Sequence, residues 1–189
     1  MHPTEIESCL ERMVVLTDSR EHDTEKFHRR MDEFGLWERT TLYYGDYTAK
    51  TSRNDGSEIS LVGKVHVERK SGLSEIIGNF CESALDSPYV QEWNKEHPTE
   101  KIRNRFEWEL KRAQLAGAKM YLVIENASWE HIYGHRYESR MNEKAVIATI
   151  LAYMARYNLT VLFINDRMTG HFIRDIFKYE MREELKKYE

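Results

Sequence analysis

Three side chains in the first half of the chain have the types and the spacing that metal-assisted hydrolysis of a phosphodiester requires. Glu68 and Lys70 lie two positions apart in the stretch 65–70, and side chains two apart point to the same face of a strand. Asp46 follows Gly45, whose conformational freedom permits a sharp turn. Two carboxylates supply the hard oxygen ligands that Mg²⁺ prefers. Lys70 can orient the attacking water or stabilise the developing negative charge.

The Glu-x-Lys pair alone has low specificity, but three other segments accompany it. By itself such a pair is common, and its structural alternative is a solvated strand face whose ion pair contributes little to stability. The accompanying segments are a hydrophobic run ending in Asp-x-Arg-Glu, a Gly-Asp-Tyr turn and an acidic-Ile-Ile-Gly stretch. In chain order the four segments are residues 15–21 (VLTDSRE), 45–47 (GDY), 67–71 (VERKS) and 75–78 (EIIG).

These four segments, in this order, resemble the signature of the XPF nuclease family, structure-specific endonucleases that cut branched DNA. That family belongs to the PD-(D/E)XK, restriction-endonuclease-like group. The resemblance implies that Asp46 and Glu68 bind Mg²⁺ or Mn²⁺, and that Lys70 assists the attacking water or the scissile phosphate. It also implies a mixed central β-sheet flanked by helices, and products with 5′-phosphate and 3′-hydroxyl ends. A stand-alone domain of this type is similar to versions encoded by bacteria and their phages.

Two further acidic residues have more than one interpretation. The resemblance places Asp18 in the catalytic cluster, whereas its position before the next helix also suits an N-cap, and the two roles are compatible. The family pattern puts an aspartate four residues after the lysine, and here Ser74 occupies that position, followed by Glu75. With a one-residue insertion Glu75 completes the metal shell. Otherwise it favours the N-terminus of the following helix through the dipole.

Three arginines are candidates for substrate binding. Arg20 and Arg69 stand beside the acidic residues, and because a guanidinium keeps its proton they orient carboxylates or contact phosphate. The segment 100–115 is the most basic in the chain, and its simplest interpretation is a solvated helix face with ion pairs. In the family, a helix at this place brings an arginine and a glutamate or glutamine near the metal. The resemblance therefore implies roles for Arg105 and Glu109.

The segment 129–137 combines aromatic side chains with two histidines, His131 and His135. Two histidines four apart form a metal pair only on a helix, and Gly134 between them predicts a loop, so zinc ligation is the weaker interpretation. Such a loop suits contact with nucleic acid through stacking and phosphate contacts. Packing of its aromatic side chains onto the core is the structural alternative.

Length and composition indicate one domain inside the cell. A chain of 189 residues suits a single nuclease domain, 1–189. The formal net charge is −4, so any contact with nucleic acid depends on a local basic patch. Cys9 and Cys81 form neither a disulfide framework nor a zinc spacing, which fits a reducing cytoplasm. We expect no membrane association, since no apolar run approaches the roughly 20 residues of a membrane span and the N-terminus lacks a signal-peptide pattern.

Hydrophobic periodicity predicts strands and helices in an order that suits a mixed α/β sheet covered on both faces. The hairpin signal 54–56 (NDG) places Asp46 and Glu68 on neighbouring strands. We expect no tandem helix-hairpin-helix domain. The predicted strands are 13–17, 36–44, 47–51, 59–70, 120–125 and 160–164, and the predicted helices are 24–34, 71–85, 100–115, 142–158 and 168–187, with a polar loop or broken helix at 86–99.

The leading hypothesis is therefore a Mg²⁺- or Mn²⁺-dependent endonuclease that hydrolyses phosphodiester bonds in DNA, with a preference for branched or flapped DNA that the resemblance implies. The alternative is a catalytically weak DNA-binding or scaffold subunit. Such subunits in the family lose the acidic and lysine residues that are present in this chain. The same chemistry on RNA is a third hypothesis. A homodimer or a complex with a partner protein is also expected, because related enzymes dimerise.

Overall fold

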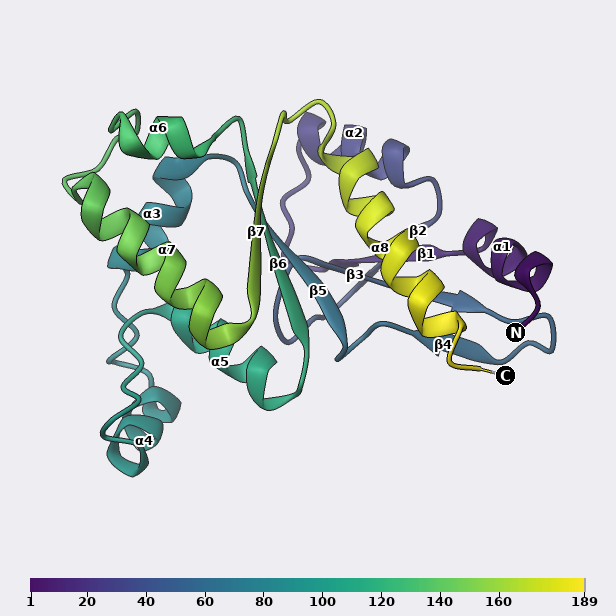
Figure 1. Cartoon of the computed structure of the whole chain (residues 1–189), viewed down its shortest axis with the longest axis horizontal. Helices are drawn as coiled ribbons and strands as arrows, with labels where there is room; N and C mark the ends of the chain where they lie inside the picture. The colour runs from purple at the N-terminus through teal and green to yellow at the C-terminus, as the bar shows by residue number, and fades with distance from the viewer. Residues whose placement is uncertain (189) are drawn as a thin grey trace.

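The computed structural model describes residues 1–188 and contains one mixed β-sheet of seven strands, with helices on both of its faces (Figure 1). This arrangement confirms the predicted α/β class. The strands are β1 (Val14–Asp18), β2 (Trp37–Thr40), β3 (Tyr47–Ser52), β4 (Glu58–Ser60), β5 (Val65–Lys70), β6 (Lys119–Glu125) and β7 (Leu159–Ile164). The helices are α1 (Pro3–Glu11), α2 (Glu25–Phe34), α3 (Leu73–Cys81), α4 (Pro88–Glu96), α5 (Arg105–Leu115), α6 (Trp129–Tyr133), α7 (Glu143–Tyr157) and α8 (Thr169–Leu185).

The strand order β2-β1-β3-β5-β6-β7 combines antiparallel and parallel pairs. β3 runs antiparallel to both β1 and β5, and β4 pairs with β3. The pairs β1–β2, β5–β6 and β6–β7 are parallel. The predicted hairpin signal 54–56 joins β3 to β4, with Gly56 at φ +84°. The predicted proximity of Asp46 and Glu68 follows from the pairing of β3 with β5.

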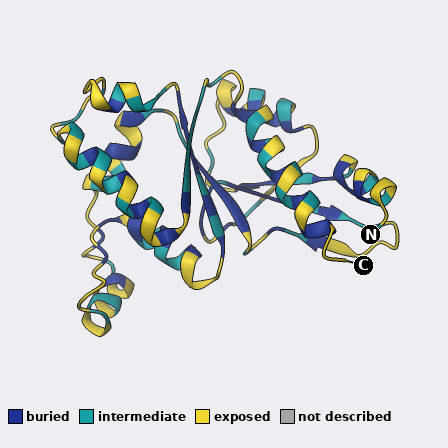
Figure 2. Cartoon of the chain, viewed as in Figure 1, coloured by how far each residue is buried: buried dark blue, intermediate teal, exposed yellow. Residues whose placement is uncertain are grey.

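Two hydrophobic cores lie on opposite faces of the sheet, because successive side chains of a strand alternate between faces. On β6, Val123 belongs to the core formed with α1, α2 and α8, whereas Leu122 and Ile124 belong to the core formed with α3, α5 and α7. Figure 2 shows that the helices of both layers turn their buried sides toward the sheet. Phe34 and Phe177 are fully buried in the first core, and burial of such a side chain contributes about 1.5–3 kcal/mol.

Residues 82–104 form a small lobe around α4, which lies away from the sheet (Figure 1). A β-bridge between Ser83 and Asn104 closes the neck of this lobe, hereafter the α4 lobe. The expectation of a polar loop or broken helix at 86–99 is corrected, because α4 is a regular helix that begins at Pro88, where a fixed φ suits the first turn. The lobe has its own apolar cluster, made of Ala84, Val90, Ile102 and Trp93, against which Trp108 of α5 packs.

Several element boundaries differ from the prediction for local reasons. The predicted strand 59–70 is divided into β4 and β5 by a tight turn, in which the amides of residues 64 and 65 donate to the Leu61 carbonyl oxygen. The predicted helix 100–115 begins only at Arg105, because the Asn104 side chain caps it by accepting from Glu107 N (2.8 Å). The strand at 36–44 is reduced to β2, and the helix at 71–85 ends with α3 at residue 81.

The predicted loop at 129–137 is wrong in its first half. Ser128 caps α6 by accepting a hydrogen bond from His131 N, and the helix ends at Gly134. His131 therefore lies on a helix, whereas His135 lies beyond its end in the left-handed region (φ +50°). The two histidines therefore do not share a helix, which agrees with the prediction made from Gly134.

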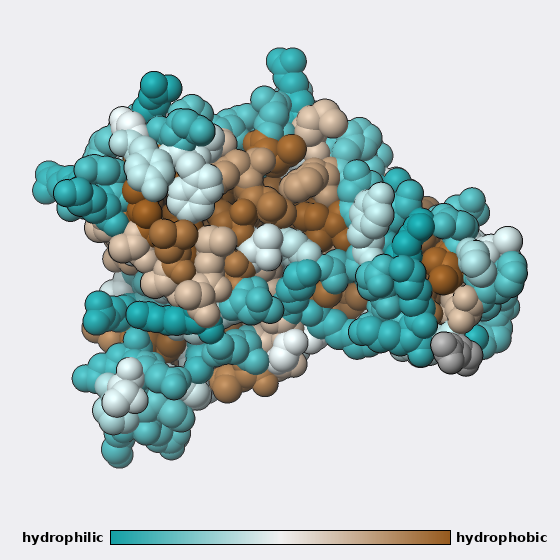
Figure 3. Space-filling view, in the orientation of Figure 1, coloured by the Kyte–Doolittle hydropathy of each residue, from teal (hydrophilic) through white to brown (hydrophobic). Residues whose placement is uncertain are grey.

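The edge of the sheet at β7 carries an apolar surface. Figure 3 shows apolar side chains gathered over β7, between α7 and α8. Residues 160–164 of this edge strand are only partly buried. Apolar surface along an open strand edge is characteristic of interaction sites. None of the helices within residues 1–188 has the length and apolar character needed to cross a membrane.

The contact between α2 and α8 depends on a close approach at Gly170. A Cβ atom at this position would lie 2.7 Å from Glu33 Cβ and 2.9 Å from the Arg30 carbonyl oxygen. Only glycine permits this approach without a shift of one helix. Gly78 of α3 provides a contrast, because a Cβ atom there would have no neighbouring atom within 4 Å.

We expect Gly170→Ala to lower the free energy of unfolding by about 1–3 kcal/mol, because α8 must move away from α2. Alanine is otherwise the better helix former by about 1 kcal/mol, so the control Gly78→Ala is expected to keep or raise stability. Urea denaturation of both variants measures the effects. A Gly170→Ala protein as stable as the wild type would contradict the tight α2–α8 contact.

Candidate active site

Asp46 is positioned by the pairing of β3 with β5. Tyr47 of β3 is the register partner of Val67 of β5. One position earlier, Asp46 N donates to the Val67 carbonyl oxygen (2.8 Å), and Arg69 N donates to Asp46 Oδ2 (2.7 Å). These two hydrogen bonds hold the Asp46 carboxylate against the strand that carries Glu68.

The turn before Asp46 requires a glycine. Gly45 adopts φ +68°, and a Cβ atom there would lie 3.1 Å from both His66 Cβ and the Val67 carbonyl oxygen. Its amide donates to Glu109 Oε1 (2.6 Å), which brings a carboxylate from α5 to the same place. Gly45 thus permits both the turn and the approach of the second element.

Glu68 and Lys70 face the same side of β5, as their spacing predicts. Lys70 Nζ lies 2.6 Å from Glu68 Oε1 and 3.6 Å from Glu75 Oε1. Glu68 is buried, whereas the Glu75 side chain on α3 is 40% exposed. The lysine is therefore held between one buried and one accessible carboxylate.

These side chains line a cleft of about 780 Å³ between the sheet, α3, α5 and the α4 lobe. The predicted residues Asp18, Asp46, Glu68, Lys70 and Glu75 all line it. Carboxylates outnumber basic groups in its wall, so the cleft suits a cation. The acidic residues are Asp18, Glu21, Asp46, Glu68, Glu75, Glu82, Asp86 and Glu109, and the basic residues are Arg20, Arg69, Lys70, Arg105 and Arg112.

Three buried carboxylates in the cleft, those of Asp46, Glu68 and Glu109, have raised pKa values. Burial and the neighbouring Glu68 hold the pKa of Asp46 well above its usual value. Burial and the charge of Glu109 raise the pKa of Glu68 to about 8, although Lys70 opposes this shift. The pKa of Glu109 is also raised, by burial and by Asp46. Because these charges repel each other in a poorly hydrated place, they favour binding of a further cation.

The donor set fits a hard divalent cation. Asp46 Oδ1 and Glu68 Oε2 accept no hydrogen bond from residues 1–188, so each carboxylate keeps one oxygen for a ligand. Within the same residues, no group of three or more His, Cys, Asp and Glu side chains is assembled as a metal cage. Mg²⁺ takes one or two carboxylates and completes its shell with water and phosphate oxygens, so two open carboxylates suffice.

Asp18 has its oxygens occupied within the protein. Arg20 donates to Asp18 Oδ1 through its backbone N (2.8 Å) and Nε (2.6 Å), and Arg20 Nη2 and Leu42 N donate to Oδ2 (3.0 and 2.8 Å). Burial raises the pKa of Asp18, but these hydrogen bonds outweigh it and leave the pKa below its usual value. Thr24 rather than Asp18 caps α2. Asp18 therefore orients Arg20, whose side chain is 71% exposed at the cleft.

The other predicted residues lie at the margins of the cleft. Glu75 Oε2 accepts from both Ser71 N and Ser71 Oγ (2.7 Å each), and these bonds lower its pKa against the effect of burial. Arg69 points to the opposite face of β5 from Glu68, where Nη1 lies 3.4 Å from Glu125 Oε2. Arg105 is 71% exposed at the rim and pairs with Glu82 (3.1 Å).

A buried network beneath the site was not predicted. Arg30 Nε donates to the Tyr47 hydroxyl (3.1 Å), which donates to Glu21 Oε2 (2.7 Å), and Arg30 Nη2 also contacts that oxygen (3.1 Å). Arg30 is 3% exposed. Its position three residues after Phe27, on the apolar face of α2, is the signal in the sequence that could have revealed a buried ion pair.

His131 and His135 lie outside the site. Neither lines the cleft, and His135 Nδ1 instead lies 3.6 Å from Glu143 Oε2 of α7. Trp129 packs partly buried against the second core, with its ring edge-on to Phe163. The core-packing interpretation is thus confirmed for Trp129 but wrong for Tyr133, which is 66% exposed. The zinc interpretation of the histidines gains no support within residues 1–188.

The fold and the cleft together define an α/β protein with an acidic centre formed where two adjacent strands and α5 meet. The sequence identifies the family within this class. The family model described as "ERCC4 domain" matches residues 17–176, so the chain belongs to the ERCC4 domain family. This finding confirms the resemblance to the XPF nuclease domain. A comparison with curated protein sequences finds no match.

Two solved structures share the fold. XPF from Aeropyrum pernix matches at a TM-score of 0.54 and 15% identity, over 87% of this chain and 65% of that one. XPF from Aeropyrum pernix in complex with DNA matches at a TM-score of 0.56 and 15% identity, over 91% of this chain and 66% of that one. This chain therefore spans about two thirds of the length of these proteins.

Removing the charge of Arg30 should destabilise the fold. We expect Arg30→Met to lower the free energy of unfolding by about 2–4 kcal/mol, because Glu21 loses its nearer cation and keeps only Arg69, whose Nε lies 4.0 Å away. The control Lys26→Met removes an ion pair to Asp166 from a lysine that is 52% exposed, and should cost less than about 1 kcal/mol. Urea denaturation compares the two. Equal effects would contradict a structural role for the network.

Protonation of His66 should weaken the fold in acid. Burial lowers the pKa of His66 to about 4, and Gly63 N donates to its Nε2 (3.0 Å). The unfolded chain, with a pKa near 6.5, binds more protons between pH 6.5 and 4, so stability is lost as the pH falls through this range. The loss should reach roughly 3 kcal/mol. His66→Gln should lack this component when both proteins are denatured in urea at each pH, and parallel pH profiles would show that His66 is not responsible.

Proposed function

We propose that this chain is a divalent-metal-dependent DNA endonuclease that hydrolyses phosphodiester bonds. The observation that carries the proposal is the cleft in which Asp46 and Glu68 keep open oxygens beside Lys70. Membership of the ERCC4 domain family supports the same activity. In this proposal Asp46 and Glu68 hold Mg²⁺ or Mn²⁺, and Glu75 stands next to Lys70 as a further ligand. When bound, the cation would supply Lewis-acid stabilisation of the phosphate charge.

Lys70 acts as a fixed cation rather than as a base. Burial alone lowers its pKa, but Glu68 and Asp46 more than compensate and raise it above the usual value, so the amine stays protonated near neutral pH. Its three N–H groups can therefore donate to the attacking water or to the scissile phosphate while the ion pair with Glu68 holds it in place. A group that cannot release its proton cannot serve as the general base.

The arginines have supporting roles. Arg20 is oriented by Asp18 and reaches the cleft with an exposed guanidinium, which suits contact with a DNA phosphate. Asp18 thus contributes to catalysis by positioning Arg20. Arg69 neutralises the charge of Glu125 beneath the site. Arg105 lies at the rim of the cleft, where it can contact the DNA backbone.

DNA is the proposed substrate, and the similar structure of an XPF in complex with DNA supports it. The preference for branched or flapped DNA comes from the family resemblance. A homodimer or a partner protein, and a place in the cytoplasm, also stay predictions. The apolar surface over β7 is available for such a partner.

Cleavage of labelled DNA tests the proposal. We expect Mg²⁺- or Mn²⁺-dependent cutting of fork, flap, junction or duplex DNA, and none with a chelator. Asp46→Asn and Lys70→Ala should each reduce the rate by about 10²-fold or more, because the first removes a charge that holds the cation and the second removes a cation that stabilises the reacting phosphate. The control Glu183→Gln removes an exposed carboxylate of α8 outside the cleft and should leave the rate unchanged.

A thermal unfolding control separates lost chemistry from lost fold. In the Asp46→Asn variant the side-chain amide keeps an oxygen that can accept the bond from Arg69 N, while the repulsion with Glu68 disappears. Without metal at pH 8, Asp46→Asn should therefore unfold at the same or a higher temperature than the wild type. DNA binding without cutting in every metal and substrate would favour the scaffold alternative and refute the nuclease.

A further inference from the structure

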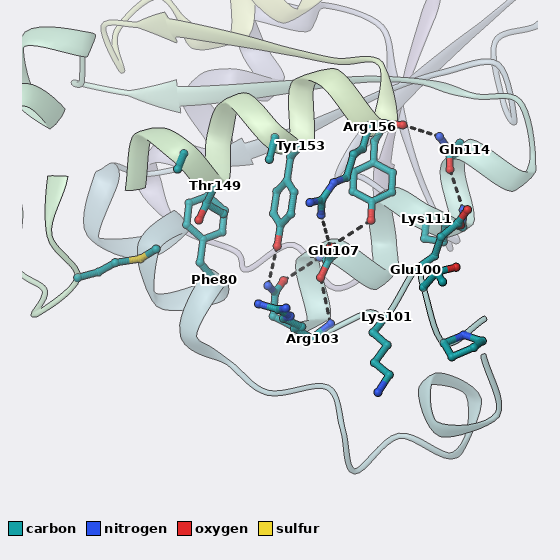
Figure 4. Close-up of a pocket in the computed structure, with 17 residues that line it drawn as sticks. Phe80, Glu100, Lys101, Arg103, Glu107, Lys111, Gln114, Thr149, Tyr153 and Arg156 are labelled. Carbon is teal, nitrogen blue, oxygen red and sulfur yellow. Dashed lines mark hydrogen bonds and ion pairs between the residues drawn. The ribbon is translucent and has the colours of Figure 1, made fainter. Parts of the chain in front are cut away.

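A second hollow lies on the other side of α5 from the cleft. It has a volume of about 900 Å³ and is bounded by α5, α7 and the end of the α4 lobe (Figure 4). It shares no lining residue with the cleft. On α5, Glu107 and Lys111 face this hollow, hereafter the α5–α7 groove, whereas Glu109 and Arg112 face the cleft.

The groove has the opposite charge balance to the cleft. Basic groups outnumber acidic ones in its wall, although the whole chain has a formal net charge of −4. It is therefore the kind of local basic patch on which nucleic-acid binding by an acidic protein depends. The basic residues are Lys101, Arg103, Lys111 and Arg156, and the acidic residues are Glu100 and Glu107.

The wall of the groove is held in place by buried polar contacts. Glu107 is 3% exposed, accepts from Arg103 N (3.0 Å) and from the Tyr157 hydroxyl (3.2 Å), and lies 3.5 Å from Arg156 Nη1. Asn104 donates to the Tyr153 hydroxyl (2.7 Å), which ties α5 to α7. Figure 4 shows Arg103 and Arg156 in contact with Glu107 from the neighbouring elements.

Two of the basic side chains remain available for a ligand. Lys111 already contacts Glu100 and Gln114 (3.0 Å each), and Arg156 contacts Glu107. Within residues 1–188, neither Lys101 nor Arg103 has an ion-pair partner, and both are exposed. Exposed cations on a rigid wall suit the phosphate groups of a nucleic-acid backbone.

The α4 lobe stands between the two hollows. Residues 82–90 of the lobe contribute to the wall of the cleft, and residues 98–103 contribute to the wall of the groove. A helix with its side chains is about 10–12 Å across, so α5 keeps the hollows close but separate. A strand that leaves a branch point beside the cleft therefore has to cover only about this distance to reach the groove.

We propose that the α5–α7 groove binds the phosphate backbone of a second DNA strand, which leaves a branch point while the strand to be cut enters the cleft. This inference rests on the proposed nuclease function and deepens it. Lys101 and Arg103 contact the phosphates, Glu107 positions the wall, and the α4 lobe separates the two strands. The groove then contributes to a preference for branched over continuous DNA.

Binding of labelled DNA tests this inference. The double variant Lys101→Ala/Arg103→Ala is compared with the control Arg167→Ala/Lys178→Ala, which removes the same charge from positions that line neither hollow. Binding to a fork and to a plain duplex of equal length is measured in EDTA over a series of salt concentrations. For the fork, we expect the groove variant to bind about tenfold more weakly and its salt slope to fall by about two. The control should change neither.

The outcomes separate this inference from the proposed function. A wild type that binds DNA but cuts none would refute the nuclease, yet the fork–duplex comparison would still test the groove. A wild type that cuts forks, with a groove variant that binds them as tightly as the control does, would overturn the groove assignment. Equal weakening for fork and duplex would also overturn it, because the groove would then serve general DNA affinity. Thermal unfolding confirms that both double variants are folded.

Discussion

The antiparallel pairing of β3 with β5 is the constraint on which the site depends. Through this pairing, Asp46 forms hydrogen bonds with the Val67 carbonyl oxygen and with Arg69 N. The two negatively charged carboxylates of Asp46 and Glu68 therefore lie on neighbouring strands, where little water reaches them. Burial raises both pKa values, the charge of Glu68 adds to the shift of Asp46 and that of Glu109 to the shift of Glu68, and Lys70 offsets only part of the negative charge. The fold must hold this unfavourable arrangement, which becomes favourable once a cation is bound.

The surroundings of the site show how the fold holds these charges. On one side of the sheet, the buried Arg30 and Tyr47 form an ionic network with Glu21, which also lines the cleft. On the other side, α5 supplies Glu109 to the Gly45 amide and turns Glu107, Lys111 and Gln114 toward the α5–α7 groove. One helix thus separates an acidic hollow from a basic one, which places cation binding and phosphate binding on either side of the same element.

Much of this arrangement could be predicted from local patterns. The spacing of Glu68 and Lys70 predicts a shared strand face, and the glycine before Asp46 predicts the turn. Patterns of this kind do not show which hydrogen bonds a carboxylate accepts. Asp18 was therefore placed in the catalytic cluster or at an N-cap, whereas its oxygens are occupied by Arg20 and Leu42 N. Residues 86–99 were predicted as a polar loop or broken helix because of Pro88 and Pro98, whereas Pro88 occupies the first turn of α4.

The sequence by itself determined the alternation of strands and helices, the order of the motifs and the resemblance to the XPF nuclease family, because these depend on local periodicity and spacing. Only the tertiary structure decided which charges meet. Arg30 reaches Glu21 and Tyr47, Glu109 reaches Gly45, and the groove gathers basic groups from α7 and from the segment before α5. These contacts join residues far apart in the chain, and long-range pairing is set by packing of the whole core rather than by any local pattern.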